Sequence, residues 1–283
     1  MSSTCQLFQK KAFSRLFWVQ FLGAFNDNVF KNALVVMMAA MVLSAIFAIV
    51  LLQLGFATGD IFGALALIAF ALSLGIAIKY SKHMFRLVAS LIIRTIYRVR
   101  YGQLELIPEK GAGIIICNHQ SMVDALVVAA VTPRPVYFVM DHNFYKPLLR
   151  PMFRLLNVIP IAQAKEDPMR KEKAFEEVEK RLARGQLVCI FPEGMLTRDG
   201  DMNPFRSGVE RILNANPVPV IPFAIDGLFG SWFSFEKGKP LSGMPKPKRR
   251  KITVKIADAL PPETPKQQMQ QVVGEMLSPS EGP

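Results

Sequence analysis

The segment IIICNHQSMVD, residues 114–124, ends an apolar run with an Asn-His pair and has an aspartate five positions after the histidine. Imidazole titrates near neutral pH, so His119 could act as a general base that takes a proton from an alcohol. Asp124, about one helical turn further on, would then fix the tautomer of the ring and stabilise the imidazolium. Since no serine or cysteine nucleophile motif lies nearby, the pair favours direct transfer of a group to an acceptor hydroxyl.

The same residues also have non-catalytic interpretations. Ser121 and Asp124 have the spacing of a capping box at the start of a helix, which accounts for both without chemistry. His119 could also be a structural histidine. A metal site would need more ligands, and the other two histidines, His83 and His142, lack metal-ligand spacing, so no metal is expected.

The elements that would position this pair are short strands alternating with helices. Apolar runs at 113–117, 136–139, 157–161, 187–191 and 218–225 are typical of buried strands, and residues 168–184 show an amphipathic helical pattern. This alternation predicts an α/β fold with a mixed, mostly parallel sheet flanked by helices. The motif FPEG, residues 191–194, follows the run QLVCI, so we expect it on the same rim of the sheet as His119.

The N-terminal part of the chain is apolar enough for a membrane. Residues 33–54 carry no charge and match a hydrocarbon core of about 30 Å, and a second uncharged run covers residues 61–78. Together they predict a transmembrane helical hairpin within a membrane anchor of residues 1–83. Residues 12–30 are apolar but broken by NDN, so they either lie in the interface or span with their polar side covered.

Charge sets the expected orientation and partners. Lysines and arginines flank the hairpin on both sides, whereas the turn between the runs carries only Asp60, so both ends should face the cytoplasm. Residues 84–101 place Arg86, Arg94 and Arg98 near one side of an expected helix on an anionic leaflet, with packing on the soluble domain as the alternative. A cytoplasmic domain at 102–260 and a polar C-terminal tail at 261–283 complete the predicted division.

The net charge of +12 among 283 residues implies an anionic partner. Nucleic acid is disfavoured, because no recognition motif accompanies the charge and two apolar spans already explain a basic cytoplasmic face. An anionic membrane surface or an acidic carrier protein remains. Cys117 and Cys189 lie in apolar runs without metal spacing, so we interpret them as reduced core residues.

Four motifs carry a resemblance to a known family. NHQSMVD resembles the NHxxxxD box of the glycerolipid acyltransferase superfamily, and FPEGMLTRDG resembles its FPEG box. NVIPI and VPVIPF stand where that superfamily has its (G)xIPI and Val-Pro blocks. The resemblance implies transfer of a fatty acyl group from acyl-CoA or acyl carrier protein to the hydroxyl of a lysophospholipid or glycerol-phosphate-type acceptor, without a cofactor.

The same resemblance assigns roles to single residues. His119 becomes the general base and Asp124 its partner, while Asn118 would shape the turn or help stabilise developing negative charge. The FPEG box would bind the acceptor, although for Glu193 an ion pair with a nearby arginine is the structural alternative. The box residues concerned are Pro192, Glu193 and Gly194.

The motifs also depart from the family in ways that bear on the acceptor. Members that form phosphatidic acid read FPEGTRS, whereas this chain reads FPEGMLT, so Leu196 replaces an arginine that helps hold a glycerol phosphate. Gln163 likewise stands where an arginine is often found. A lysophospholipid that already bears a head group is therefore as good a candidate as lysophosphatidic acid. The residues left to contact the head group are Thr197, Arg198, Arg206 and Lys165, with ordinary surface charge as the alternative for the last three.

Residues 17–36 resemble the first helix of bacterial lysophospholipid transporters of the major facilitator class, which are often fused to an acyltransferase. The chain is too short for twelve spans, so transport by it alone is not expected. The implied location is the bacterial inner membrane, with the catalytic domain facing the cytoplasm. A non-catalytic, lipid-binding or scaffolding remnant of such a fusion is the alternative, against which the intact His119, Asp124 and Glu193 argue.

Overall fold

A computed structural model describes residues 28–55, 57–145, 150–163, 165–236, 238–241 and 249–277. The chain divides into two compact units, Met1–Lys79 and Tyr80–Pro283. We describe each unit by itself.

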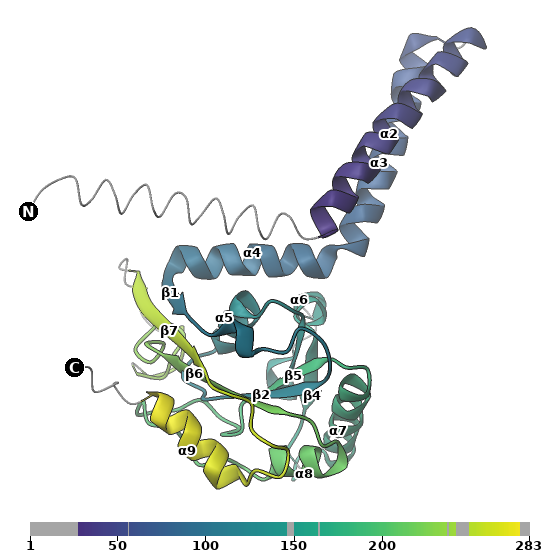
Figure 1. Ribbon diagram of the computed structural model, residues 1–283. Coiled ribbons are helices and arrows are strands. Elements are labelled where there is room, and N and C mark those ends of the chain that lie inside the picture. The colour runs from purple at the N-terminus through teal and green to yellow at the C-terminus, as the bar shows by residue number, and fades with distance from the viewer. Residues whose placement is uncertain are drawn as a thin grey trace, which may run out of the picture. The chain divides into compact units, whose positions relative to one another are not determined.

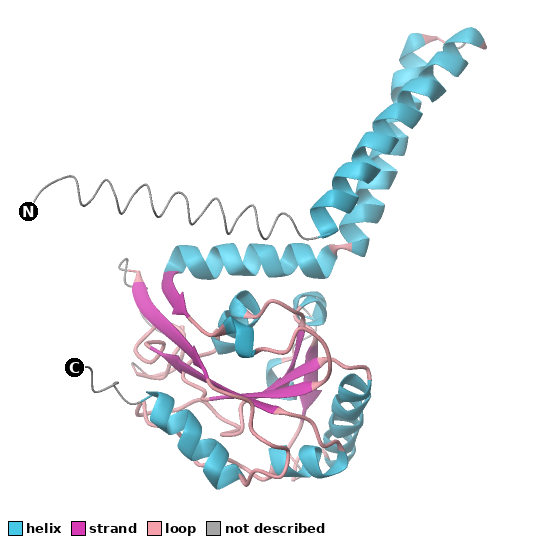
Figure 2. Ribbon diagram, in the orientation of Figure 1, coloured by secondary structure: helices cyan, strands magenta, loops and turns pink. Residues whose placement is uncertain are grey.

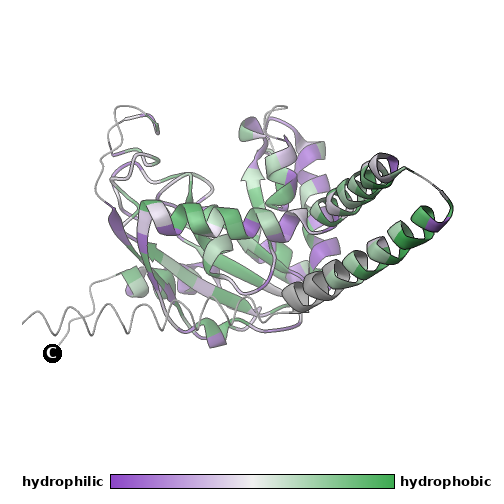
Figure 3. Cartoon of the chain, turned by 90° about the horizontal axis from the view of Figure 1, so that it is seen from above, coloured by the Kyte–Doolittle hydropathy of each residue, from purple (hydrophilic) through white to green (hydrophobic). Residues whose placement is uncertain are grey.

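The first unit contains two consecutive helices, α2 (Asn28–Gln53) and α3 (Thr58–Lys79), which contact each other. Of the described residues, those of α3 form the one helix that is long and apolar enough to cross a membrane, with a mean hydropathy of 2.6 in its most apolar stretch (Figure 3). The predicted spans 33–54 and 61–78 fall on these helices, but a transmembrane hairpin stays a prediction. Most of the segment 12–30, up to residue 27, lies outside the described residues.

The second unit is built on a seven-stranded sheet with the order β1-β7-β6-β2-β5-β3-β4 (Figure 2). Every neighbouring pair runs parallel except β6 and β7. The predicted α/β fold with a mixed, mostly parallel sheet flanked by helices is therefore confirmed. The strands are β1 (Tyr97–Tyr101), β2 (Gly113–Cys117), β3 (Val136–Asp141), β4 (Val158–Ile161), β5 (Leu187–Ile190), β6 (Val220–Asp226) and β7 (Arg250–Ile256).

Helices cover both faces of this sheet (Figure 1). One apolar cluster joins α4 (Ser81–Ile96) and α5 (Asp124–Val131) to the sheet, and the other joins α7 (Pro168–Ala183), α8 (Gly208–Ala215) and α9 (Lys266–Leu277). The short helix α6 (Arg150–Leu155) precedes the edge strand β4. Strand β2 sends Ile115 and Cys117 into the first cluster and Ile114 and Ile116 into the second, which is why its sequence is apolar throughout.

Two predicted segments differ from the structure. The helix expected at 84–101 ends at Ile96, and residues 97–101 form β1, because Tyr97, Val99 and Tyr101 suit a strand that pairs with β7. The expected polar tail at 261–283 contains α9, whose Met269 and Val273 are fully buried against the sheet. Strand β1 and helix α9 therefore extend the domain beyond both ends of the predicted range 102–260.

Helix α4 packs on the domain, which is the alternative considered for it, whereas contact with a leaflet stays a prediction. Ala89 and Ile93 are buried in the domain, and the Arg86 guanidinium donates to the Thr132 carbonyl at 2.8 Å, so one side of α4 packs on the domain. Six apolar side chains of α4 are between 44% and 54% exposed, namely Met84, Leu87, Val88, Leu91, Ile92 and Ile96.

Candidate active site

His119 lies two residues beyond the end of β2, and Asp124 is the first residue of α5. The Nδ1 atom of His119 is 2.8 Å from Oδ2 of Asp124. The ring also stacks on Phe191, with 4.2 Å between ring centroids and 20° between planes, so its orientation is fixed from two sides. Its side chain is 22% exposed, and within the described part of the chain Nε2 has no hydrogen-bond partner. The pair thus presents one free imidazole nitrogen to solvent.

The Asp124 carboxylate is fully buried and is held by the turn that precedes α5. Besides His119, its Oδ2 atom accepts from the backbone N–H of Gln120 at 2.7 Å and of Ser121 at 2.9 Å. Burial raises the pKa of Asp124, and the hydrogen bonds from His119, Ser121 and Gln120 act in the opposite direction. The Oδ1 atom has no partner among the described residues. All the contacts of this carboxylate therefore converge on one oxygen.

The expected capping box forms only in part. Asp124 accepts the Ser121 N–H, as such a box requires, but α5 begins at Asp124 rather than at Ser121. The Ser121 hydroxyl lies 3.4 Å from that of Ser231 instead of bonding the Asp124 N–H. Capping therefore does not account for the position of Asp124 next to an imidazole.

Glu193 connects two loops at the rim of the sheet. Its Oε1 atom accepts from the backbone N–H of His119 at 2.7 Å. Its Oε2 atom accepts from the backbone N–H and the side-chain amide of Asn203, at 2.8 and 2.9 Å. Burial raises the pKa of Glu193, and these hydrogen bonds oppose that shift. The carboxylate, 2% exposed, binds main-chain and amide N–H groups in place of the arginine that the sequence suggested as an alternative.

The loop that follows β5 also bonds the main-chain carbonyl of His119. The Thr197 N–H donates to the His119 carbonyl at 2.9 Å, and the Thr197 hydroxyl donates to Asp199 at 2.9 Å. Thr197 is 2% exposed, so it builds this loop from inside. Both backbone groups of His119 are consequently bonded by residues of the FPEG loop, residues 191–203.

The side chain of Asn118 bonds the backbone of β6. Its side-chain amide donates to the Ile225 carbonyl at 2.9 Å, and its oxygen accepts the Ile225 N–H at 2.8 Å. These two bonds tie the end of β2 to β6. Of the two roles expected for Asn118, this geometry favours shaping the turn over stabilising charge.

Of the remaining candidate residues, Gly194 and Arg206 contact each other, and Arg206 lines a cavity beside the FPEG loop. Gly194 has a φ of +68°, and a Cβ there would lie 2.9 Å from the Arg206 side chain, so glycine lets Arg206 pass across it. The Arg206 N–H donates to the Pro192 carbonyl at 2.9 Å. Glu193, Arg206 and Lys266 line a cavity of about 580 Å³ there. Arg198 and Lys165 are exposed and do not line this cavity. The Arg198 guanidinium lies over the Phe235 ring at 5.7 Å.

Two contacts within the candidate site were not expected from the sequence. Phe191 supports the imidazole and Asn203 supports Glu193. Phe191 is the first residue of the FPEG motif, so its position was available as a signal, whereas Asn203 lies in no motif. Among the described residues no group of three or more His, Cys, Asp or Glu could hold a metal ion.

Parts of this chain are similar to known proteins. Residues 98–226 match the family model described as Acyltransferase. The chloroplastic 1-acyl-sn-glycerol-3-phosphate acyltransferase BAT2 of Brassica napus is 25% identical over 150 residues, which are 53% of this chain and 43% of that protein. The 1-acyl-sn-glycerol-3-phosphate acyltransferase beta of Homo sapiens is 26% identical over 151 residues, 52% of this chain and 50% of that protein. The chain thus spans about half the length of the curated relatives it matches.

A solved structure shares the fold. The crystal structure of the 1-acyl-sn-glycerophosphate (LPA) acyltransferase PlsC from Thermotoga maritima aligns with a TM-score of 0.54 at 20% identity, over 72% of this chain and 82% of that chain. This likeness shows the fold. The family model and the relatives support the glycerolipid acyltransferase superfamily and an acyltransferase enzyme.

Proposed function

We propose that this chain is a membrane-bound O-acyltransferase that moves a fatty acyl group from an acyl thioester to the hydroxyl of a lysophospholipid or glycerol-phosphate-type acceptor. The observation that carries the proposal is the His119 ring, bonded to a buried carboxylate through Nδ1 and open at Nε2. This is the arrangement that a general base for an alcohol requires.

The reaction needs no covalent intermediate on the protein. Nε2 of His119 takes the hydroxyl proton as the acceptor oxygen attacks the thioester carbonyl. The tetrahedral intermediate collapses with cleavage of the C–S bond, and the leaving thiolate takes the proton back from the imidazolium. The products are an ester and a free thiol. Asp124 keeps Nδ1 protonated and stabilises the imidazolium while it exists.

The FPEG loop contributes by holding the base. Glu193 and Thr197 bond the N–H and the carbonyl of His119, so the ring is positioned before substrate arrives. The cavity lined by Arg206 and Lys266 is the place we assign to the acceptor head group. The relatives named above act on 1-acyl-sn-glycerol-3-phosphate, whereas Leu196 replaces a phosphate-binding arginine, so head-group preference is the variable to measure.

Membrane attachment belongs to the same proposal. It is supported by the apolar helix α3 and by the six exposed apolar side chains of α4, which are spaced as on a helix that lies at a membrane surface. The location we propose is the cytoplasmic face of a bacterial inner membrane. The likeness of residues 17–36 to a transporter helix adds the proposal that the anchor derives from a fused transporter.

The test is product formation. The purified chain in detergent receives labelled acyl-CoA or acylated carrier protein with a panel of lysolipids that includes lysophosphatidic acid and lysophosphatidylethanolamine. We expect a diacyl product from the wild type and from a His83→Ala control, and a loss of at least two powers of ten in His119→Ala, as general-base removal produces about 10²–10⁴-fold effects. If His119→Ala and the wild type form equal amounts of product, His119 is not the general base. No product with any acceptor would favour the non-catalytic remnant.

A further inference from the structure

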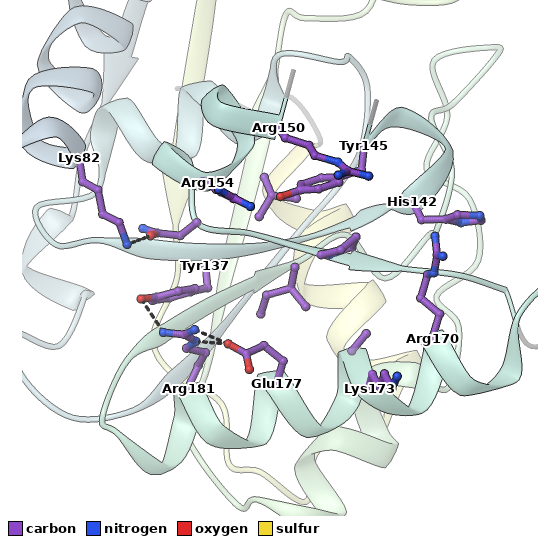
Figure 4. A pocket seen from close by; sticks show the side chains of 15 residues that line it. Lys82, Tyr137, His142, Tyr145, Arg150, Arg154, Arg170, Lys173, Glu177 and Arg181 are labelled. Atoms are coloured by element: carbon purple, nitrogen blue, oxygen red, sulfur yellow. Dashed lines mark hydrogen bonds and ion pairs between the residues drawn. The ribbon is translucent and has the colours of Figure 1, made fainter. Parts of the chain in front are cut away.

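A second cavity lies along the edge of the sheet, away from the acceptor cavity. Its volume is about 670 Å³, and it is lined by the edge strand β4 and by residues of α6 and α7. We call it the edge groove. Figure 4 shows Arg150 and Arg154 on one side of the strand and Arg170, Lys173 and Arg181 on α7 across from them.

The edge groove is strongly basic. Its lining includes six lysine and arginine side chains but a single carboxylate, Glu177. That carboxylate is already bonded to Arg181, which also donates to the Tyr137 hydroxyl at 3.0 Å. The Lys82 ammonium is bonded to the neutral Asn157 side chain at 2.8 Å, so its charge is not compensated there.

Three cations of the groove lack a counter-ion. Within the described residues the side chains of Arg150, Arg154 and Lys173 form no ion pair or hydrogen bond, although they line one hollow. Like charges gathered in a concave site repel one another and focus a positive potential outward. Such a cluster is stabilised when an anion with several charges enters, and guanidinium groups fit phosphate oxygens in particular.

The groove reaches the rim that carries the base. Its lining extends to His142 and Arg170, which follow the carboxyl ends of β3 and β4. Those ends lie on the same edge of the parallel sheet as His119 at the end of β2. In the order β2-β5-β3-β4, three strand spacings of about 4.8 Å place β4 about 14 Å from β2.

We propose that the edge groove binds the nucleotide phosphates of coenzyme A and thereby holds the acyl donor, an inference that rests on the proposed function. The pantetheine part of coenzyme A is an extended chain with two amide groups, and its reach is comparable to the separation of β4 and β2. Phosphates bound among Arg150, Arg154 and Lys173 would leave the pantetheine chain to run past the carboxyl ends of β3 and β5 toward His119.

The shape of the site favours a nucleotide over a lipid head group or a carrier protein. Several unpaired cations along one hollow match the three phosphate groups of coenzyme A better than the single phosphate of a lysolipid. A hollow of this volume encloses a small polyanion, whereas a protein surface would cover it without filling it. Tyr145, whose ring stacks on Phe153 at 5.3 Å, adds an aromatic face on which adenine can stack.

The test measures binding without turnover. Isothermal titration of the full chain in detergent uses coenzyme A, dephospho-coenzyme A and pantetheine at fixed ionic strength. We expect affinity to fall in that order, because each step removes phosphate. The double variant Arg154→Ser/Lys173→Ser should weaken coenzyme A binding by about tenfold or more, since two charge-assisted contacts are lost. Both side chains are exposed, so the fold is retained.

A matched control removes the same charge elsewhere. Lys180→Ser/Arg184→Ser changes one lysine and one arginine at the exposed end of α7, and it should leave the affinity within twofold. Equal affinity in the two double variants, or no binding of coenzyme A to the wild type, would overturn the proposal. So would a groove variant that loses only its binding to vesicles of anionic lipid.

The experiments test the binding of coenzyme A in the groove separately from the acyltransferase activity. If both double variants form product from acyl-CoA with the same KM for acyl-CoA, the edge groove does not bind coenzyme A, but the acyltransferase proposal stands. Binding of coenzyme A that depends on the groove, with no product from any acceptor, supports the groove and overturns the acyltransferase proposal.

Discussion

Replacing Asp124 by asparagine removes the buried charge while keeping the hydrogen bonds. The asparagine oxygen can occupy the place of Oδ2 and accept from Nδ1 of His119 and from the N–H groups of Gln120 and Ser121. Its NH₂ group then takes the place of Oδ1, which has no partner among the described residues. The buried amide costs about 1–3 kcal/mol of stability, so Asp124→Asn should fold.

The loss of activity follows from the charge. With Nδ1 and Oδ2 2.8 Å apart, the centres of the imidazolium and carboxylate charges lie about 4 Å from each other, where an effective dielectric constant of about 20 gives an attraction of about 4 kcal/mol. This attraction exists only while the imidazole is protonated, which is during the reaction. Since about 1.4 kcal/mol corresponds to a tenfold rate change, kcat/KM should fall about 10³-fold.

The assay compares initial rates of diacyl product formation with thermal unfolding. Asp124→Asn should lose activity with a small decrease in Tm, whereas Asp124→Ala should lose both, because three N–H donors lose their acceptor. Asp258→Asn, an exposed aspartate outside the site, is the control for the same chemical change. If Asp124→Asn keeps more than a tenth of the wild-type kcat/KM at nearly unchanged Tm, the carboxylate charge does not assist the base and the reasoning fails.

Three further predictions concern other parts of the chain. The raised pKa of Glu193 means that the folded state binds this proton more tightly than the unfolded state, so its contribution to stability is present below the unfolded pKa and is lost as pH rises through the folded pKa. In urea titrations between pH 4 and 7, the free energy of unfolding of wild type minus that of Glu193→Gln should therefore decrease with pH, and an increase would contradict the cause given. Met269→Ala should lower the free energy of unfolding by about 2–5 kcal/mol in the same titrations, because the side chain is fully buried. A change below about 0.5 kcal/mol would show that α9 does not pack on the domain. Leu91→Lys/Ile92→Lys should weaken co-sedimentation of the detergent-free chain with lipid vesicles without lowering Tm, whereas unchanged sedimentation would show that α4 does not contact lipid.

The sequence predicted the centre of the sheet well. The runs at 113–117 and 187–191 match β2 and β5 to within one residue, because strands buried on both faces are apolar throughout. The helix predicted at 168–184 ends one residue earlier, at Ala183. Local patterns were enough for these elements.

The outer elements could not be predicted in the same way. Strands β1 and β7 carry arginine or lysine between their apolar residues, and β1 pairs with β7 at a distance of about 150 residues in the sequence. Strand β7 also pairs with β6. Helix α9 buries few side chains among glutamines, so its composition reads as polar. In the site, the pairing of His119 with Asp124 followed from residue types. The contacts of Glu193 did not, because its main partners are backbone N–H groups, which nearly every residue possesses.

The place of β7 between β1 and β6 has a consequence for biosynthesis. Strand β1 is made early, yet its hydrogen-bonding partner in the sheet leaves the ribosome only after residue 250 has been translated. Non-local pairing of this kind slows folding and leaves apolar surface exposed while synthesis continues. Strand β1, which follows α4, therefore stays unpaired until nearly the whole domain has been synthesised.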